Sequence, residues 1–308
     1  MMFCILFRSE CEVLNETSFI GHIMPTLLVR YGEIGLKSES VRRRFEQQLI
    51  KDIKQRHVLA KTQCIVTQMR GRLFVDSDDW RKSCEILSRT FGVVSFSPVT
   101  TAPSDLETLI KASVEYAEPL MFDGASFAVR ARRSGNHPYT SQKVAEGVGE
   151  AVLKAYGGKG VKVSLDEPDI EIHVEVREKT AYMFSLVLPG PGGMPLGTQG
   201  KILSVVDTER GLASTWLMMK RGCSVLVMAE NEDDIAPLRS WYPNLRAIAA
   251  EDDLLAAADS NQCMGVAVPY GLGDLAGSRI IKGNLPVFYP LIGMNEEDTK
   301  GLLKRIRA

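Results

Sequence analysis

Long apolar runs are absent from this 308-residue chain: none approaches the roughly 20 residues that a membrane-spanning helix needs. Internal repeats and low-complexity tracts are missing too, which argues against a solenoid or a long disordered segment. Because 45% of the residues are hydrophobic and 24% are charged, the chain can bury a substantial core. We therefore expect two or three globular domains, cytoplasmic and without membrane attachment.

Paired cysteines and clustered histidines are also absent. The six cysteines form no C-x-x-C pair, and the four histidines have no other ligand type at metal-binding spacing. These residues are Cys4, Cys11, Cys64, Cys84, Cys223 and Cys263, and His22, His57, His137 and His173. The pattern predicts reduced intracellular thiols and no metal site.

The first 23 residues lack the features of a signal peptide. Arg8 and Glu10 break the short apolar stretch, no basic segment precedes it, and no cleavage site follows it. A strand and turn begin at Met24. We therefore treat residues 1–23 as a leader that is not necessarily native, and leave it out of the expected fold.

The net charge is −1, which argues against generic binding of polyanions, but the charge is unevenly spread. From Met24 to Val75 there are eleven Lys and Arg residues against four Asp and Glu, whereas residues 201–308 hold 12 basic and 14 acidic residues. A polyanion should therefore bind the N-terminal part of the molecule. Arg42 and Arg43 are candidate contacts there, although a solvated helix face explains these arginines equally well.

Hydrophobic periodicity predicts an ordered series of strands and helices. The first group has the order βαββα, which suggests a small antiparallel sheet backed by helices; its elements are 26–32, 39–57, 64–68, 72–76 and 79–92. A second α+β unit follows, with strands at 93–99, 126–133, 170–178 and 181–188 and helices at 105–122 and 141–157. Five glycines and three prolines within residues 189–201 indicate a linker, after which strands and helices alternate.

The stretch "VRARRSGNHPYTSQ" carries the most chemical information in the second unit. Arg130, Arg132 and Arg133 end a strand, and Tyr139, Thr140 and Ser141 lead into a helix whose first N–H groups lack partners. Guanidinium groups, hydroxyl donors and an aromatic ring suit a sugar-phosphate chain with an unstacked base. A structural explanation is also open, since Thr140 or Ser141 can be a helix N-cap and neighbouring strand residues point to opposite faces.

A strand-loop-helix junction at "SVVDTERGLASTWLMMKRGC" opens the third unit. Such junctions bind phosphate through backbone N–H groups and the helix dipole, and their loops are usually rich in glycine. This loop has a single glycine, Gly211, and an acidic stretch at residues 207–209. The sequence therefore raises the question of whether a phosphate binds here.

Several long, irregular motifs make the chain similar to the tRNA 4-thiouridine sulfurtransferase family, the ThiI-like THUMP-domain enzymes also linked to thiamine thiazole synthesis. In chain order they are "VRYGEIGLKS", "RGRLFV", "ARRSGNHPYTSQKVAEGVG", "EPDIEIHVEVREKTAYMF", "GPGGMPLGTQGKIL", "LMMKRG" and "PVFYPLIGMNEED". The resemblance covers nearly everything from Met24 to the C-terminus.

The resemblance implies a three-domain organisation. We expect an α+β ferredoxin-like domain at 24–82, a THUMP RNA-binding domain at 83–188, a Gly/Pro linker at 189–200 and a truncated α/β PP-loop-like, Rossmann-like domain at 201–308. Family members use ATP and Mg²⁺ to adenylate a uridine of tRNA, whose acceptor end the THUMP domain grips. The expected RNA-binding residues are Arg132, Arg133, His137, Tyr139, Ser141, Arg42 and Arg43. The resemblance also implies a homodimer.

The phosphate-binding loop departs from the family pattern at every position. Active members carry S-G-G-[IF]-D-S before the helix that ends in M-M-K-R-G; the six corresponding residues here are Val206, Asp207, Thr208, Glu209, Arg210 and Gly211. Asp207 and Thr208 replace both glycines, and Arg210 reverses the charge of the aspartate. A carboxylate at position 207 would repel phosphate.

Two further departures agree with this one. The later nucleotide motif, T-G-E-[SA]-L-G-Q-V-[AS]-S-Q, stands here as "VPYGLGDLAGS", with Pro269 at the first glycine and Ser278 at the final glutamine; proline removes an N–H donor. The third domain is also short and lacks the region of the catalytic cysteine that passes sulfur. Neither Cys223 nor Cys263 replaces it, and there is no rhodanese domain.

We therefore expect a tRNA-binding THUMP protein with no catalytic residues, no cofactor and a degenerate nucleotide loop. Two alternatives stay open. One is an active 4-thiouridine synthase whose ATP chemistry or sulfur comes from a rebuilt site or a partner protein. The other is a dimeric scaffold of an RNA-modification complex.

Overall fold

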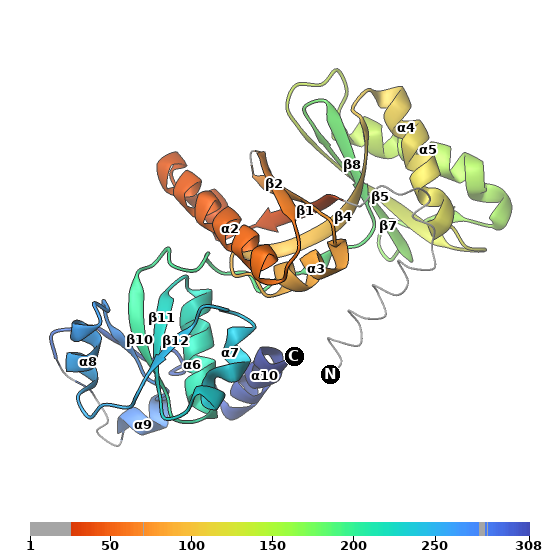
Figure 1. The fold of residues 1–308 in the computed structure, drawn as a ribbon. Helices are drawn as coiled ribbons and strands as arrows, with labels where there is room; N and C mark the ends of the chain where they lie inside the picture. The colour runs from red at the N-terminus through yellow and green to blue at the C-terminus, as the bar shows by residue number, and fades with distance from the viewer. Residues whose placement is uncertain (1–25, 70, 277–280, 282) are drawn as a thin grey trace.

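The computed structural model describes residues 26–69, 71–276, 281 and 283–308. The expected leader, residues 1–23, and Ser278 lie outside the described residues. Three units follow one another along the described chain, and the first lies between the second and the third (Figure 1). None of the helices in the described part has the length and apolar character needed to cross a bilayer.

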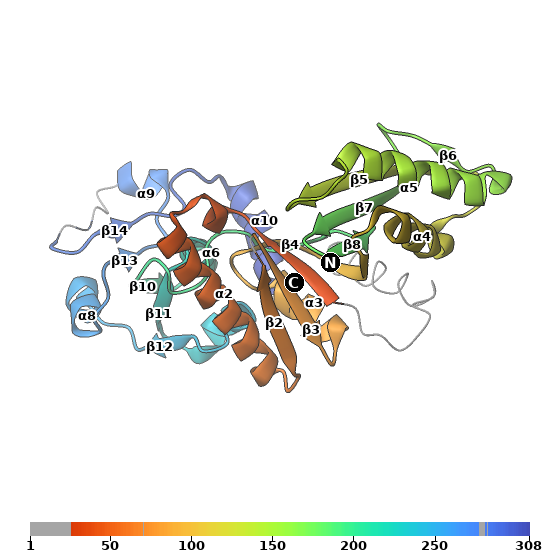
Figure 2. The same cartoon turned by 90° about the horizontal axis from the view of Figure 1, so that it is seen from above.

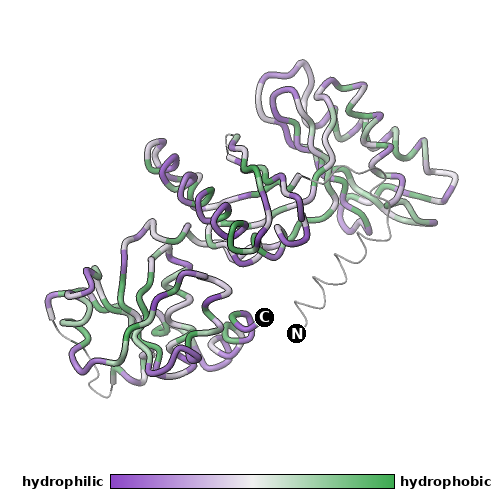
Figure 3. Tube along the Cα trace, in the orientation of Figure 1, coloured by the Kyte–Doolittle hydropathy of each residue, from purple (hydrophilic) through white to green (hydrophobic). Residues whose placement is uncertain are grey.

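The first unit is an antiparallel sheet with helices on one face. It contains β1 (Thr26–Tyr31), the 3₁₀ turn η1 (Glu33–Leu36), α2 (Glu39–Leu59), β2 (Cys64–Met69), β3 (Arg72–Ser77), α3 (Trp80–Ser88) and β4 (Val93–Pro103). The strand order is β2-β3-β1-β4. Leu27 and Val29, alternate residues of β1, share a buried core with Phe45 and Leu49 of α2. Hydrophilic and hydrophobic residues alternate along α2, as a helix with one buried face requires (Figure 3).

The first unit extends further along the chain than expected. The expected boundary at residue 82 falls inside α3, and Cys84 and Leu87 of that helix belong to the core of the first unit. Phe96 of β4 is part of the same core. The boundary lies within β4 because α3 must bury its apolar face and β4 completes the sheet.

The second unit packs two helices on a mixed sheet. It contains α4 (Leu106–Ala117), η2 (Glu118–Leu120), β5 (Ser126–Ser134), α5 (Ser141–Tyr156), η3 (Gly157–Lys159), β6 (Lys162–Val163), β7 (Ile170–Arg177) and β8 (Thr180–Phe184). The following strand, β9 (Leu188–Pro189), returns to the first unit and pairs with β4. Val144 and Val148 of α5 meet Phe127 of β5 and Ile172 of β7 in its core. β5 runs parallel to β7, and β7 runs antiparallel to β8.

Strand β4 joins the first two units into one sheet. Its first part pairs with β1 and its last part, from Thr100 to Pro103, pairs with β8. The full order is β2-β3-β1-β4-β8-β7-β5-β6, with β9 beside β4. The sheet curls so that Phe74 of β3 stacks on Tyr182 of β8, with ring centroids 4.6 Å apart. The two units therefore form one continuous surface.

The glycine-rich segment at 189–200 lies close against its neighbours. The Gly190 N–H donates to the carbonyl of Val94 (2.9 Å), and the Met194 N–H donates to the carbonyl of Lys220 (3.0 Å). Gly193 has φ +75°, and a Cβ there would collide with the Lys220 carbonyl oxygen. The glycines thus allow a close approach that fixes the third unit to the first.

The third unit is a five-stranded parallel sheet. It contains β10 (Lys201–Val206), α6 (Glu209–Lys220), β11 (Ser224–Ala229), η4 (Glu232–Ile235), α7 (Ala236–Arg239), β12 (Arg246–Ile248), α8 (Leu254–Ser260), β13 (Val266–Ala267), α9 (Leu272–Ala276), β14 (Val287–Phe288) and α10 (Glu296–Arg307). Figure 2 shows this sheet and the second unit on opposite sides of α2. The three units confirm the predicted fold class.

The strand order in the third unit is β12-β11-β10-β13-β14. The chain therefore first builds outward on one side of β10 and then crosses to the other side. The carboxyl ends of β10 and β13 flank this switch point, which is where open parallel sheets bind their ligands. The loop at 206–211 lies at this place.

Candidate functional site

Strand β5 presents two arginines on the face of the sheet away from the helices. Arg130 pairs in register with His173 of β7, and Arg132 pairs with Glu175. Arg133 follows Arg132 and points toward the helices, as Ala131 does, because neighbouring strand residues face opposite ways. The structure thus corrects the expected pair of Arg132 and Arg133: the two guanidinium groups that share a face belong to Arg130 and Arg132.

A hollow of about 500 Å³ opens beside these two arginines. It lies between the free edge of β5, the first turn of α5 and the neighbouring strand β7. Its lining residues are Val129, Arg130, Ala131, Arg132, Ser141, Gln142, Ala145, Glu171 and His173. We call it the β5–α5 hollow. The sequence identifies Arg130 as one of the arginines that end this strand but does not place it among the expected RNA-binding residues, although its spacing of two from Arg132 puts both on one face. Gln142, Glu171 and His173 were not predicted as site residues.

Charged groups in the hollow are partly paired. Nε of Arg130 lies 2.9 Å from Oε1 of Glu171, and its Nη2 donates to the carbonyl of Leu165 (2.7 Å). Nε2 of His173 lies 3.2 Å from the other oxygen of Glu171. Burial lowers the pKa of His173, although Glu171 opposes the shift. Arg132 is exposed and makes no ion pair with the residues that the structure describes, so its charge is available to a ligand.

The helix α5 points its N-terminus at the hollow. Thr140 is the N-cap, accepting a hydrogen bond from the Lys143 N–H (3.1 Å), which settles the choice between Thr140 and Ser141. Ser141 is the first residue of the helix and lines the hollow. The N-terminal end of a helix favours an anion. The positive charge of Arg132 and the N-terminus of α5 therefore both favour binding of an anion in the hollow.

Tyr139 does not reach the hollow as a stacking platform. Its side chain is buried in the core of the second unit, and its hydroxyl donates to the carbonyl of Ser104. One face of the ring is covered by His137, with centroids 5.5 Å apart. The expected stacking of Tyr139 on a base is therefore wrong. The ring is packed into the core of the second unit, so it has no open face for a base. His137 is half-buried, with Nε2 3.2 Å from the carbonyl of Ser134.

Arg42 and Arg43 belong to α2, on the first unit, and are not brought into the hollow. Arg43 forms an ion pair with Glu39 at 2.5 Å, one helical turn away. Nε of Arg42 lies 3.9 Å from Glu46, whose buried carboxylate also accepts from the Tyr31 hydroxyl. These two arginines thus have local partners on their own helix.

The loop after β10 is short and closely packed. Strand β10 ends at Val206 and α6 begins at Glu209, so only two residues connect them. A Cβ on Gly211 would lie 2.7 Å from Cα of Val206 and 2.8 Å from the Val205 carbonyl oxygen. Gly211 is therefore explained by the close approach of α6 to β10.

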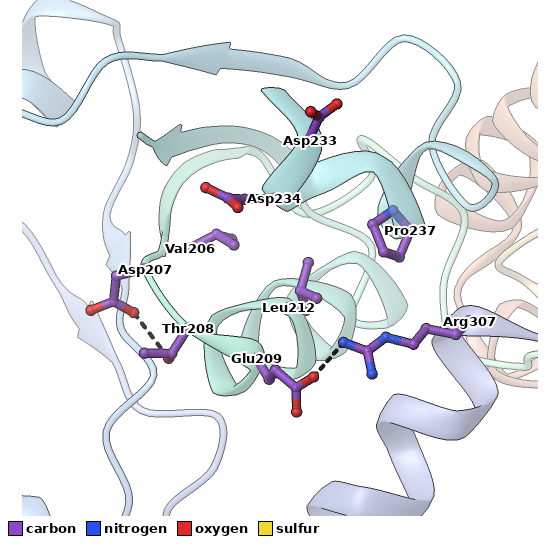
Figure 4. Close-up of a pocket in the computed structure, with 9 residues that line it drawn as sticks. All are labelled: Val206, Asp207, Thr208, Glu209, Leu212, Asp233, Asp234, Pro237 and Arg307. Carbon is purple, nitrogen blue, oxygen red and sulfur yellow. Dashed lines mark hydrogen bonds and ion pairs between the residues drawn. The ribbon is translucent and has the colours of Figure 1, made fainter. Parts of the chain in front are cut away.

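A second hollow, of about 280 Å³, lies over this loop. Its lining residues are Val206, Asp207, Thr208, Glu209, Leu212, Asp233, Asp234, Pro237 and Arg307 (Figure 4). The lining includes four carboxylates and one guanidinium, and that guanidinium is paired with Glu209 at 2.5 Å. The lining is therefore negative overall.

An ion pair joins the two segments that correspond to nucleotide motifs. Nη2 of Arg210, in the first turn of α6, lies 3.1 Å from Oδ2 of Asp274 in α9. The same oxygen accepts the Gly271 N–H at 2.8 Å. A Cβ on Gly271 would meet Nη2 of Arg210 at 2.6 Å, so the guanidinium lies directly over this glycine. The pair thus spans the switch point between β10 and β13.

The thiols of the third unit are buried. Burial raises the pKa of Cys223 and of Cys263, which keeps both thiols protonated. Within the described residues no group of three potential His, Cys, Asp or Glu ligands comes together. Cys4 and Cys11 lie outside the described residues.

Two family models match the chain. The ThiI ferredoxin-like domain matches residues 26–97, and the THUMP domain matches residues 103–186. The two matches meet within β4, in agreement with the shared strand. The first unit is therefore a ThiI ferredoxin-like domain, and the second, with the β5–α5 hollow, is a THUMP domain.

The chain also resembles solved structures. PH1313 from Pyrococcus horikoshii is 27% identical, with a TM-score of 0.76 over 92% of this chain and 100% of that one. A 4-thiouridine synthetase in complex with RNA and bound ATP has a TM-score of 0.71 over 92% of this chain and 85% of that one. Its identity is 21%, so it shows a common fold.

Curated relatives extend the similarity through most of the sequence. A probable tRNA sulfurtransferase from Methanobrevibacter smithii is 40% identical over 210 residues, which are 66% of this chain and 52% of the relative. The corresponding protein of Methanothermobacter thermautotrophicus is 32% identical over 338 residues, covering 91% of this chain and 84% of the relative. The second alignment is longer than this chain, so this chain lacks internal segments that the relative has. The chain belongs to the THUMP-domain tRNA sulfurtransferase family.

Proposed function

We propose that this protein binds the acceptor end of tRNA through its ferredoxin-like and THUMP domains, and that its third domain has lost the ATP-dependent chemistry of the family. The observation that carries the first part is the β5–α5 hollow on the THUMP domain. It combines the unpaired Arg132, the N-terminus of α5 and the polar side chains of Ser141 and Gln142.

These groups suit a single-stranded RNA end. A guanidinium and helical N–H groups favour a phosphate, and the hydroxyl and amide can bond sugar or base edges. The paired imidazole of His173 and guanidinium of Arg130 are flat groups on which an unstacked base can lie. In this proposal they take the role that we first expected of Tyr139.

The third domain does not suit a nucleotide. The hollow at the loop after β10 is lined by four carboxylates, and their negative charge would repel a triphosphate. They belong to Asp207, Glu209, Asp233 and Asp234. The guanidinium of Arg210, which could bind a phosphate, forms an ion pair with Asp274 instead. We therefore derive no step of ATP chemistry for this chain and expect it to need no cofactor.

A second candidate is an active tRNA sulfurtransferase. The similarity to probable tRNA sulfurtransferases along 91% of this chain favours it. An active chain would need a partner to supply sulfur, since the buried Cys223 and Cys263 are poor nucleophiles. Deleting the gene and measuring 4-thiouridine in total tRNA distinguishes the two candidates: disappearance of the modified base supports the enzyme.

Calorimetric titration with ATP and Mg²⁺, together with tRNA binding at two salt concentrations, tests the proposal directly. We expect tRNA affinity that falls with salt and no heat from ATP. Micromolar ATP binding would overturn the assignment of the third domain, and absence of tRNA binding would overturn the assignment of the THUMP hollow. Self-association into a homodimer stays a prediction, which light scattering of the purified protein can test.

A further inference from the structure

A cluster of arginines lies where the ferredoxin-like and THUMP domains meet on the curled sheet. Arg72 of β3 reaches Glu175 of β7, with Nε to Oε1 at 3.1 Å and Nη2 to Oε2 at 3.3 Å. Arg177 holds the same carboxylate, with Nε 2.6 Å from Oε1. We call Arg30, Arg72 and Arg177 around Glu175 the seam cluster.

Arg30 of β1 completes the cluster without a carboxylate of its own. Its Nη1 donates to the hydroxyl of Ser97 (3.0 Å), and its guanidinium lies over the ring of Phe184, 4.5 Å from the centroid. Nη2 is buried and makes no hydrogen bond with the residues that the structure describes. Burial lowers the pKa of Arg30 to about 10; Glu175 opposes the shift, while Arg72 and other nearby arginines add to it.

The cluster is more positive than a structural link between two domains requires. One arginine would satisfy Glu175, whereas three guanidinium groups gather around it, and a buried uncompensated charge is costly. The side chains of Arg72 and Arg177 keep 17% and 11% of their surface exposed. An anion from solvent can therefore approach the cluster on Arg72 and Arg177, whereas Nη2 of Arg30 lies behind them and is closed to solvent.

We propose that the seam cluster binds a phosphate of the RNA backbone. The planar guanidinium matches phosphate oxygens in a two-pronged geometry, and two or three such groups form a stronger site than one. Arg132 places the seam next to the hollow, because it lines the hollow and pairs in register with Glu175. An RNA strand that enters the hollow would thus cross onto the ferredoxin-like domain. The inference rests on the proposed binding of tRNA.

The test is the salt dependence of tRNA affinity for the full-length variants Arg177→Gln and Arg72→Gln. Each lost phosphate contact should make the slope of log K against log salt shallower by about 0.7 to 0.9, and weaken binding about tenfold at low salt. Arg177→Lys keeps the charge and should restore most of the slope. Arg246→Gln, an exposed arginine of the third domain, is the matched control and should behave like the parent protein.

Folding is checked by the midpoint of thermal unfolding. If both glutamine variants fold and keep the parent slope and affinity, the cluster does not bind RNA. If inorganic phosphate, compared with chloride at equal ionic strength, stabilises the parent protein but not Arg177→Gln while the RNA slope is unchanged, the cluster is a site for free phosphate and the proposal is again wrong. If Arg132→Gln weakens tRNA binding but the seam variants do not, the proposed function stands and this inference fails.

Discussion

The ring of Phe91, in the turn between α3 and β4 of the ferredoxin-like domain, packs against Trp216 of α6 in the third domain, with ring centroids 5.3 Å apart. Trp241 meets both rings, at 5.6 Å from Phe91 and 5.3 Å from Trp216. Arg56 of α2 adds hydrogen bonds to the carbonyls of Ser240 and Trp241. One aromatic side chain of the first domain thus belongs to the core of the third.

Replacing Phe91 by alanine should therefore destabilise the protein strongly. Deleting a fully buried phenylalanine costs about 3 to 5 kcal/mol, because apolar burial is lost and a cavity remains. Urea unfolding followed by tryptophan fluorescence measures the effect. Phe122, which is 56% exposed, provides the control: Phe122→Ala should change the free energy of unfolding by about 0.5 kcal/mol or less. Equal effects of the two substitutions would contradict the packing described here.

The opposite orientation of two neighbouring arginines leads to a sharper prediction about RNA. Arg132→Ala should weaken tRNA binding about tenfold, because it removes the unpaired cation of the hollow. Arg133→Ala should have a smaller effect, since that guanidinium donates to the carbonyl of Gly135 and points toward the helices. Filter binding at low salt measures both. The double variant should bind weakly, and undiminished affinity would remove the site.

Two histidines predict how stability changes with pH. His57 is 1% exposed, with Nδ1 near the Ile53 carbonyl and Nε2 near the Ser83 hydroxyl. Burial lowers the pKa of His57 and of His173 below the ordinary value of 6.5. The unfolded chain then binds more protons than the folded one as pH falls through 6.5, so acid should destabilise the fold.

Urea titrations between about pH 8 and pH 5 measure this dependence. His57→Gln and His173→Gln should each flatten the fall in unfolding free energy below pH 6.5, because each removes one site that the unfolded state protonates more readily. Each variant is the control for the other, because His57 lies in the ferredoxin-like domain and His173 lies in the hollow of the THUMP domain. Each substitution should remove only the pH dependence of its own histidine. If the unfolding free energy of both variants falls with pH as steeply as that of the parent protein, the acid sensitivity comes from other groups.

The sequence predicts the architecture well where patterns are local. Periodicity locates the main strands and helices, and the irregular motifs identify the family. Contacts that depend on the arrangement of distant segments could not be predicted. Burial of Tyr139 depends on Ser104 and His137 closing around it, and the Arg210–Asp274 pair depends on β10 and β13 becoming neighbours. Glu175 and Arg72 meet only because the sheet curls.

Gly211 offers the last test, because two explanations of this residue disagree. As a member of a phosphate-binding loop it would tolerate serine, the residue that active relatives carry there. In the structure a Cβ would lie 2.7 Å from Cα of Val206, so Gly211→Ser should cost about 1 to 3 kcal/mol through overpacking. Gly273→Ala is the control, since a Cβ there meets nothing within 4 Å. If Gly211→Ser is as stable as the parent in urea, α6 does not approach β10 as closely as described, and the loop has room to be rebuilt as a nucleotide site.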